Sequence, residues 1–143
     1  MAKVNVYLTF DGNCEEAFNF YKSVFGGDFD LRRFSEMPPQ EGSPPMSEEM
    51  GRKIMHVSYP ISEETILMAS DRGGWGPDLV VGNNFSISVN PDSEEEALRV
   101  FKGLSDGGNI ITPMEKTFWN ALFGMCTDRF GINWMVNYLL PSA

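Results

Sequence analysis

Two stretches of this sequence, EEAFNFYKSVFGG at residues 15–27 and EEALRVFKGLSDGG at residues 95–108, are copies of one segment at an offset of 80 residues. Each copy begins with glutamates, which favour a helix N-terminus, and ends in Gly-Gly, which is typical of a left-handed helix cap. Each is therefore predicted to be an amphipathic helix with one buried stripe. The stripe recurs at i, i+4 and i+7: Ala17, Tyr21 and Val24 in the first copy, and Ala97, Phe101 and Leu104 in the second.

Strand-like runs surround both helices. An alternating run precedes each helix, at residues 4–10 and 84–90. Strict alternation of apolar and polar residues predicts a strand with one apolar face. Three further runs follow each helix, at about 29–35, 53–60 and 65–70 in the first half and at about 109–113, 122–127 and 132–139 in the second. The sequence thus predicts an α+β fold in which a βαβββ module occurs twice, with mostly antiparallel sheet and helices covering one face.

Two interruptions divide this pattern. Residues 37–50 contain four prolines and no periodicity, which predicts a long loop. Residues 72–78, RGGWGPD, have the composition of a hinge. We therefore expect a single domain over residues 1–143, with module one at about 1–71, a hinge loop at about 72–82 and module two at about 83–143.

The composition excludes several classes of protein. With 20 acidic and 11 basic residues, the chain has a net charge of -9 and lacks the basic surface that nucleic acid requires. No apolar run is long enough to span a membrane, and the N-terminus does not resemble a signal peptide, so we expect a cytoplasmic protein. One histidine and two cysteines are too few for the common zinc sites or a disulfide framework. Cys14 and Cys126 are expected to be buried reduced thiols.

The polar side of the predicted strands, called the second face below, carries few charges. It holds Asn5, Tyr7 and Thr9 in the first strand, Asn84, Ser86 and Ser88 in the first strand of module two, and Asn133, Met135 and Asn137 in the last strand. An ordinary solvent face on an acidic protein would collect more charged residues. The neutral set favours the lining of a small-molecule pocket over a wetted or dimer-covered sheet.

Beside the doubled plan, the chain contains a series of short segments in a fixed order. They are NCEEA (13–17), FYK (20–22), FGG (25–27), MP (37–38), IMH (54–56), SD (70–71), TFW (117–119) and DRFGINWMVN (128–137). Plan and segments together resemble PhnB-like proteins, a group of the glyoxalase/bleomycin-resistance/extradiol-dioxygenase superfamily, also called vicinal oxygen chelate. The resemblance covers residues 4–139 and implies paired modules whose curved sheets surround a cavity, usually in a homodimer.

Enzymes of that superfamily place four metal ligands, typically His and Glu, on the first and fourth strands of each module. The resemblance puts these positions at Asn5, Asn84, Met135 and either Leu67 or Met68. None of them is His, Asp or Glu, so no negative charge would offset the dehydration of a divalent ion. We therefore expect no metal and no other cofactor, although a divalent metal at other positions is a disfavoured possibility.

Two polar or aromatic groups have open roles. His56, with Ile54 and Ser58 expected on its face, is either a general base or donor in the cavity or a structural histidine. Trp119, in the loop at 117–120 after Glu115, either stacks on a planar ligand while Glu115 meets a cation, or plugs the core.

Three further residues are given structural roles by the sequence. Asp71 and Asp128 stand at strand ends and are read as turn residues. Cys14 stands at a helix start and is read as a buried thiol rather than a reactive one.

Two functions remain. The favoured one is a PhnB-like protein that binds an unknown small molecule without the usual metal centre, as a homodimer and with no membrane or nucleic-acid partner. The alternative is an enzyme of the superfamily, of isomerase, lyase or dioxygenase type, using displaced ligands such as His56 and Glu115 or using His56 as acid/base. Some relatives are named quinone methyltransferases, but no segment resembles a methyl-donor site. The ligand-binding residues are predicted to be Asn5, Tyr7, His56, Asn84, Trp119 and Met135.

Overall fold

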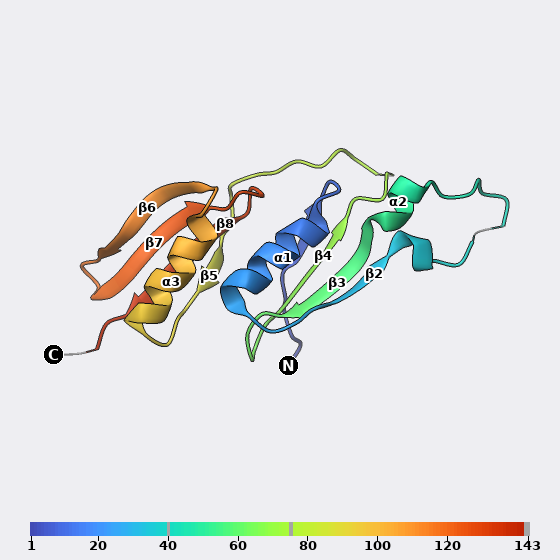
Figure 1. The fold of residues 1–143 in the computed structure, drawn as a ribbon. Coiled ribbons are helices and arrows are strands. Elements are labelled where there is room, and N and C mark those ends of the chain that lie inside the picture. Colours follow the sequence, from blue (N-terminus) through green and yellow to red (C-terminus); the bar gives the residue numbers. More distant parts are fainter. Residues whose placement is uncertain (40, 75, 142–143) are drawn as a thin grey trace. The chain divides into compact units, whose positions relative to one another are not determined.

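The computed structural model describes residues 1–39, 41–74 and 76–141 (Figure 1). The chain divides into two compact units, Met1–Val80 and Val81–Ala143. The expected loop and hinge include Gln40 and Trp75, which lie outside the described residues. Within the described part of the chain, no helix is long and apolar enough to cross a membrane.

Unit 1 is a four-stranded mixed sheet with one long helix. The strand order is β1-β4-β3-β2, with β1 parallel to β4 and the other neighbours antiparallel. Its elements are β1 (Tyr7–Phe10), α1 (Cys14–Phe25), β2 (Asp30–Arg33), the 3-10 turn η1 (Phe34–Glu36), α2 (Glu48–Arg52), β3 (Ile54–Pro60) and β4 (Ile66–Asp71).

Unit 2 repeats this plan. The strand order is β5-β8-β7-β6, again with one parallel pair, β5 and β8, beside two antiparallel pairs (Figure 1). Its elements are β5 (Ile87–Val89), α3 (Glu94–Ser105), β6 (Asn109–Lys116), β7 (Ala121–Thr127) and β8 (Asn133–Leu139). The predicted α+β fold of two βαβββ modules is confirmed.

Both repeated helices bury the predicted stripe. In α1 the aromatic Phe18 joins the stripe and makes T-shaped contacts with Phe10, Tyr21 and Tyr59 at centroid distances of 6.3, 5.6 and 6.2 Å. Perpendicular ring packing of this kind adds to the burial of apolar area. The buried helix residues are Cys14, Ala17, Phe18, Tyr21 and Val24 in α1 and Ala97, Val100, Phe101 and Leu104 in α3.

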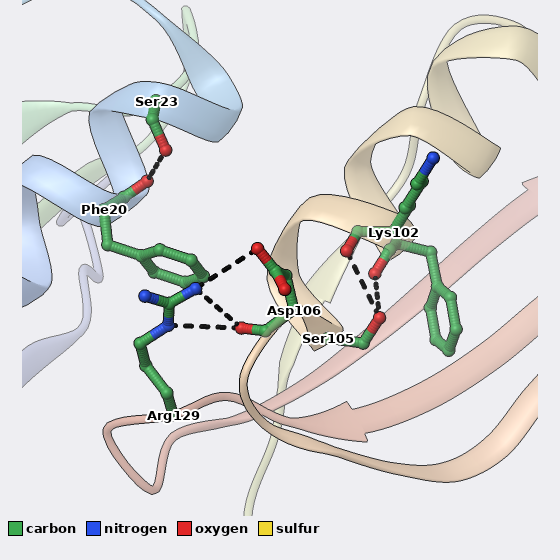
Figure 2. Close-up of polar contacts among 7 residues, drawn as sticks. Phe20, Ser23, Lys102, Ser105, Asp106 and Arg129 are labelled. Carbon is green, nitrogen blue, oxygen red and sulfur yellow. Dashed lines mark hydrogen bonds and ion pairs between the residues drawn. The ribbon is translucent and has the colours of Figure 1, made fainter.

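Gly27 and Gly107 have the positive φ of the expected left-handed caps, at 73° and 76°, but the residues that cap the two helices differ. Gly26 caps α1 with a positive φ of 80° but an extended ψ of -167°. The cap of α3 is Asp106, in extended conformation, and the pair follows it. Arg129, in the β7–β8 turn, donates from Nε and Nη2 to the Asp106 carbonyl at 3.2 and 3.0 Å (Figure 2). A cation at a helix C-terminus is favoured by the helix dipole.

Two strands begin later than the sequence predicts. β1 begins at Tyr7 rather than residue 4, and β5 begins at Ile87 rather than residue 84. Val4 and Phe85 are 93% and 54% exposed, so the prediction that they join the apolar face is wrong. Both lie before the first residues that pair with β4 and β8.

The predicted loop at 37–50 is also interrupted, by the short helix α2. Ser47 caps it, because its Oγ accepts a hydrogen bond from Met50 N at 3.1 Å. Glu48 and Glu49 occupy the first turn, where the helix dipole favours acidic side chains.

Asp71 and Asp128 are both buried, but their carboxylates accept hydrogen bonds from different kinds of partner. Asp128 is the predicted turn residue: its Oδ1 accepts from Phe130 N and Ile132 N, at 2.8 and 3.0 Å. Asp71 is not, because its partners are distant in sequence. Its Oδ1 accepts from Gly12 N and Cys14 N at 2.9 and 3.0 Å, and its Oδ2 from Ile54 N at 2.8 Å. One carboxylate thus joins the starts of α1 and β3 to the end of β4.

Candidate functional site

The second face of the unit 2 sheet is set by strand register. Residues directly opposite in a sheet point to the same side. One row contains Thr112, Met125, Met135 and Ser88 from β6, β7, β8 and β5. The next row contains Glu115, Phe123 and Asn137. These two rows combine thioethers, an aromatic ring, an amide and hydroxyls with a single carboxylate.

Trp119 lies over the second of these rows. It stands in the turn between β6 and β7, which is closed by a hydrogen bond from Thr117 N to Ala121 O at 2.8 Å. Its indole Nε1 donates to Asn137 Oδ1 at 3.4 Å, and its ring meets that of Phe123 edge-on at 5.7 Å. Phe118 packs edge-on against it at 5.0 Å. Trp119 remains 46% exposed, so it does not plug the core.

Asn137 has hydrogen-bonding capacity left over. Its side-chain oxygen accepts from Trp119, and its backbone oxygen accepts from Asn90 Nδ2 at 3.2 Å. An amide nitrogen carries two further donors. Among the described residues nothing accepts from Asn137 Nδ2, and the side chain is only half-buried. This group can therefore donate to a ligand.

Asn133 is occupied structurally. Its Oδ1 accepts from Thr127 Oγ1 at 2.7 Å, and its Nδ2 lies 3.4 Å from the carbonyl oxygens of Gly82 and Phe85. These bonds hold the segment before β5 against β8, so this amide has less to offer a ligand than Asn137.

The second face of unit 1 brings together two of the predicted residues, Tyr7 and His56. Their rings lie 5.8 Å apart at an interplanar angle of 38°. Tyr7 pairs with Met68, and Met68 pairs with Ser58 across β4 and β3. Arg32 stands opposite His56 on β2, so this face has a charged edge.

A β-bulge changes the predicted surroundings of His56. Arg32 pairs with His56 but Arg33 pairs with Ile54, so Met55 is an extra residue in β3. A bulge shifts the alternation of side chains by one position. Ile54 is therefore buried with Val57, and the prediction that it shares the face of His56 is wrong.

The two predicted asparagines lie outside the strands. Asn5 precedes β1, and its Oδ1 accepts from Ile66 N at 3.1 Å. Asn84 precedes β5 and is exposed. For the fourth strand of module one, the structure distinguishes the two alternatives: Leu67 is buried on the helix side, and Met68 is half-buried on the second face.

Comparison with known proteins identifies the family. The family model described as 3-demethylubiquinone-9 3-methyltransferase matches residues 2–137. The chain belongs to this family, that of the PhnB-like proteins. The protein PA1353 from Pseudomonas aeruginosa is 38% identical, with coverage of 99% of this chain and 100% of that one and a TM-score of 0.81. The PhnB protein of Bacillus cereus is 24% identical, covers 96% and 99% of the two chains, and has a TM-score of 0.74.

The superfamily fold is likewise shared. A glyoxylase/bleomycin resistance protein/dioxygenase domain from Frankia sp. EAN1pec matches 100% of this chain and 96% of its own, with 14% identity and a TM-score of 0.62. The predicted resemblance to PhnB-like proteins of this superfamily is confirmed. At this identity the likeness concerns the fold alone.

This PhnB-like chain also has a charged cavity that sequence reasoning missed. It has a volume of about 770 Å³ and lies at the start of α1 in unit 1. Two of its lining residues form an ion pair: Nη1 and Nη2 of Arg33 donate to the carboxylate of Glu15 at 3.1 and 2.8 Å. The hydrogen bond to this carboxylate raises the pKa of Arg33. The sequence feature that could have indicated this cavity is the set of charged residues within 11–15 and 49–53. The lining residues are Asp11, Gly12, Asn13, Glu15, Arg33, Glu49, Arg52, Lys53, Ile54 and Asp71.

Among the described residues of the PhnB-like chain, potential metal ligands do not form a cluster. Over residues 1–39, 41–74 and 76–141, no three His, Cys, Asp or Glu side chains lie close enough to hold a metal. Burial, together with Asp71 and Glu15, raises the pKa of the Cys14 thiol, and burial near Asp128 raises that of Cys126 to about 11. Both cysteines are free and buried, as predicted.

Proposed function

We propose that this PhnB-like protein binds a small organic molecule on the second faces of its sheets and uses no metal ion. Tyr7 and His56 are the binding residues of unit 1, and Trp119 and Met135 are those of unit 2. Membership of the PhnB-like family is consistent with a protein of this superfamily. The mixture of polar and apolar groups on the second faces supports the binding of a small molecule. Ligand sites combine apolar and aromatic lining with a few placed hydrogen-bonding groups.

The observation that carries the proposal is the Trp119–Asn137 arrangement. A half-exposed indole, steadied by a hydrogen bond and by edge-on contacts with Phe118 and Phe123, offers a flat surface. Asn137 Nδ2 offers unused donors beside that surface. Such a pair suits a planar molecule with a hydrogen-bond acceptor.

The metal-free part of the proposal rests on the residues at the expected ligand positions. These positions hold Asn5, Asn84, Met135 and, on the second face of β4, Met68. Amide and thioether groups supply no negative charge, whereas hard divalent cations prefer carboxylates and zinc prefers His, Cys or carboxylate.

Binding is tested with quinoline, a flat neutral probe with one ring nitrogen as acceptor. We expect chemical-shift changes at the Trp119 indole N–H and the Asn137 side-chain amide in NMR titrations. Replacing Trp119 by Ala should weaken quinoline binding about five- to ten-fold, because ring stacking is lost. The matched control is Phe20→Ala on α1, which should leave binding unchanged. Shift changes confined to other parts of the chain would contradict the proposal.

Elemental analysis tests the metal-free part. Protein purified without a chelator or an affinity tag should contain far less than one equivalent of Zn, Ni, Mn or Fe. A stoichiometric metal that is lost in His56→Ala would overturn this part and favour the enzyme alternative.

We also propose, from the resemblance, that the protein is a homodimer. Light scattering coupled to size-exclusion chromatography should give twice the 16.0 kDa chain mass. A mass of one chain at micromolar concentration would contradict this.

A further inference from the structure

Glu115 is the one charged residue in the two second-face rows described for unit 2. It stands on β6 directly opposite Phe123, whose ring contacts Trp119. Its carboxylate is exposed and, among the described residues, makes neither an ion pair nor a hydrogen bond. The neighbouring Lys116 pairs with Leu122, which places it on the other side of the sheet. The charge at this place is therefore an unpaired negative one.

The aromatic rings beside Glu115 also favour positive charge. The face of an aromatic ring is negative and its edge positive, and indole attracts cations most strongly. The rings of Phe118 and Phe123 lie roughly perpendicular to that of Trp119, at interplanar angles of 88° and 67°. Carboxylate and ring faces thus favour positive charge, while Asn137 Nδ2 requires an acceptor.

We propose that the Trp119 subsite selects planar aromatic cations that carry a hydrogen-bond acceptor, and that Glu115 is the residue that sets this selectivity. The inference rests on the proposed function, because it names the class of ligand for the same face. The cationic ring stacks on Trp119, the carboxylate of Glu115 lies beside its positive charge, and Asn137 donates to its acceptor. An anionic ring of the same size is repelled by Glu115 and by the chain's net charge of -9.

Three probes of similar shape and different charge test the selectivity. They are 1-methyl-1,5-naphthyridinium, which is positive and keeps one free ring nitrogen as acceptor, quinoline, which is neutral at pH 7 and also has one ring nitrogen, and quinoline-2-carboxylate, which is negative. Dissociation constants are measured by NMR at low salt, where interactions of exposed charges are least screened. We expect the cation to bind about two- to five-fold more tightly than quinoline, which is the range for exposed cation–π and ion-pair contacts. The anion should bind more weakly than quinoline.

The Glu115→Gln variant isolates the residue. It keeps the size of the side chain and removes the charge, so the preference for the cation should shrink by about two-fold or more while quinoline binding is unchanged. Glu95→Gln on α3 is the matched control, because it changes the net charge equally at an exposed position. It should leave the preference intact.

The outcomes separate this inference from the proposed function. If quinoline and 1-methyl-1,5-naphthyridinium bind equally at Trp119, or if Glu115→Gln retains the full preference, the selectivity is refuted and the binding face stands. If none of the three probes shifts the Trp119 or Asn137 signals, both the binding face and its selectivity are refuted.

Discussion

The two units share a strand order and a repeated helix but differ in how they use charged and polar groups. In unit 1, one buried carboxylate, Asp71, joins three separate segments, and charged residues reach the second face at Arg32. In unit 2, Asp128 accepts hydrogen bonds within its own turn and from the indole of Trp134, and Glu115 is the one charged residue in the two second-face rows described. The two units therefore share the buried stripe of the repeated helix, but they differ in their helix caps and in the residues on their second faces. The differences that follow are measurable unit by unit.

The largest expected effect comes from Asp71. Replacing it with Ala leaves three backbone N–H groups without their acceptor, and hydrogen bonds to charged groups are the costly ones to lose. We expect about 3–5 kcal/mol of destabilisation. Hydrogen exchange should lose protection in unit 1 first, whereas Asp128→Ala should affect unit 2 first. Equal loss in both units for either variant would show that the two carboxylates do not differ as described.

The Gly-Gly pairs of the two units differ in the space around their second glycine. A Cβ at Gly108 would overlap the carbonyl oxygen of Thr127 and lie 2.9 Å from Asp128 Cα, whereas one at Gly27 would meet only Tyr59 at 3.9 Å. Gly108→Ala should therefore cost about 3 kcal/mol, as in overpacked sites. Gly27→Ala should cost only about 1 kcal/mol, for its positive φ. Urea unfolding measures both, and the reverse order would contradict the close approach at Gly108.

The buried thiols predict a loss of stability at alkaline pH. The folded state raises the pKa of Cys126 from 9.0 to about 11, so the unfolded chain releases this proton first as pH rises. Stability from this group is complete below pH 9 and is lost between about pH 9 and 11. Cys126→Ala should show a smaller fall in melting temperature than wild type across this window. An equal fall would show that Cys126 does not contribute.

The smallest effect distinguishes the two helix starts. Ser93 caps α3 by accepting from Glu96 N at 3.1 Å, whereas Asn13 makes no side-chain cap bond because Asp71 supplies the acceptor for α1. Ser93→Ala should cost about 1 kcal/mol, and Asn13→Ala only a few tenths. A larger loss for Asn13→Ala in thermal unfolding would argue that Asn13 has a role of its own.

Sequence predicted the periodic parts of this molecule and missed the contacts between distant segments. The two helices follow from the spacing of apolar residues such as Ala17 and Tyr21, which is a local property. The bulge at Met55 depends on register with β2, and the role of Asp71 depends on partners up to 59 residues away. Neither leaves a local pattern.

The candidate site was predictable to a similar extent. Alternation placed Met135 on the second face, and the aromatic turn pointed to Trp119. The free donors of Asn137 could not be foreseen, because they depend on which of its atoms Trp119 and Asn90 occupy.

The central claim, that the second face of unit 2 is the ligand face, is tested most directly by methyl NMR of methionine. Met125 and Met135 form a cross-strand pair on that face. Met114 is an internal control on the helix side, since a Cβ at Gly124 would meet its Sδ at 2.6 Å and Phe101 of α3 at 2.7 Å. On titration with quinoline, the methyl signals of Met125 and Met135 should move and that of Met114 should not. Movement of Met114 alone, or of none of the three, would contradict the claim.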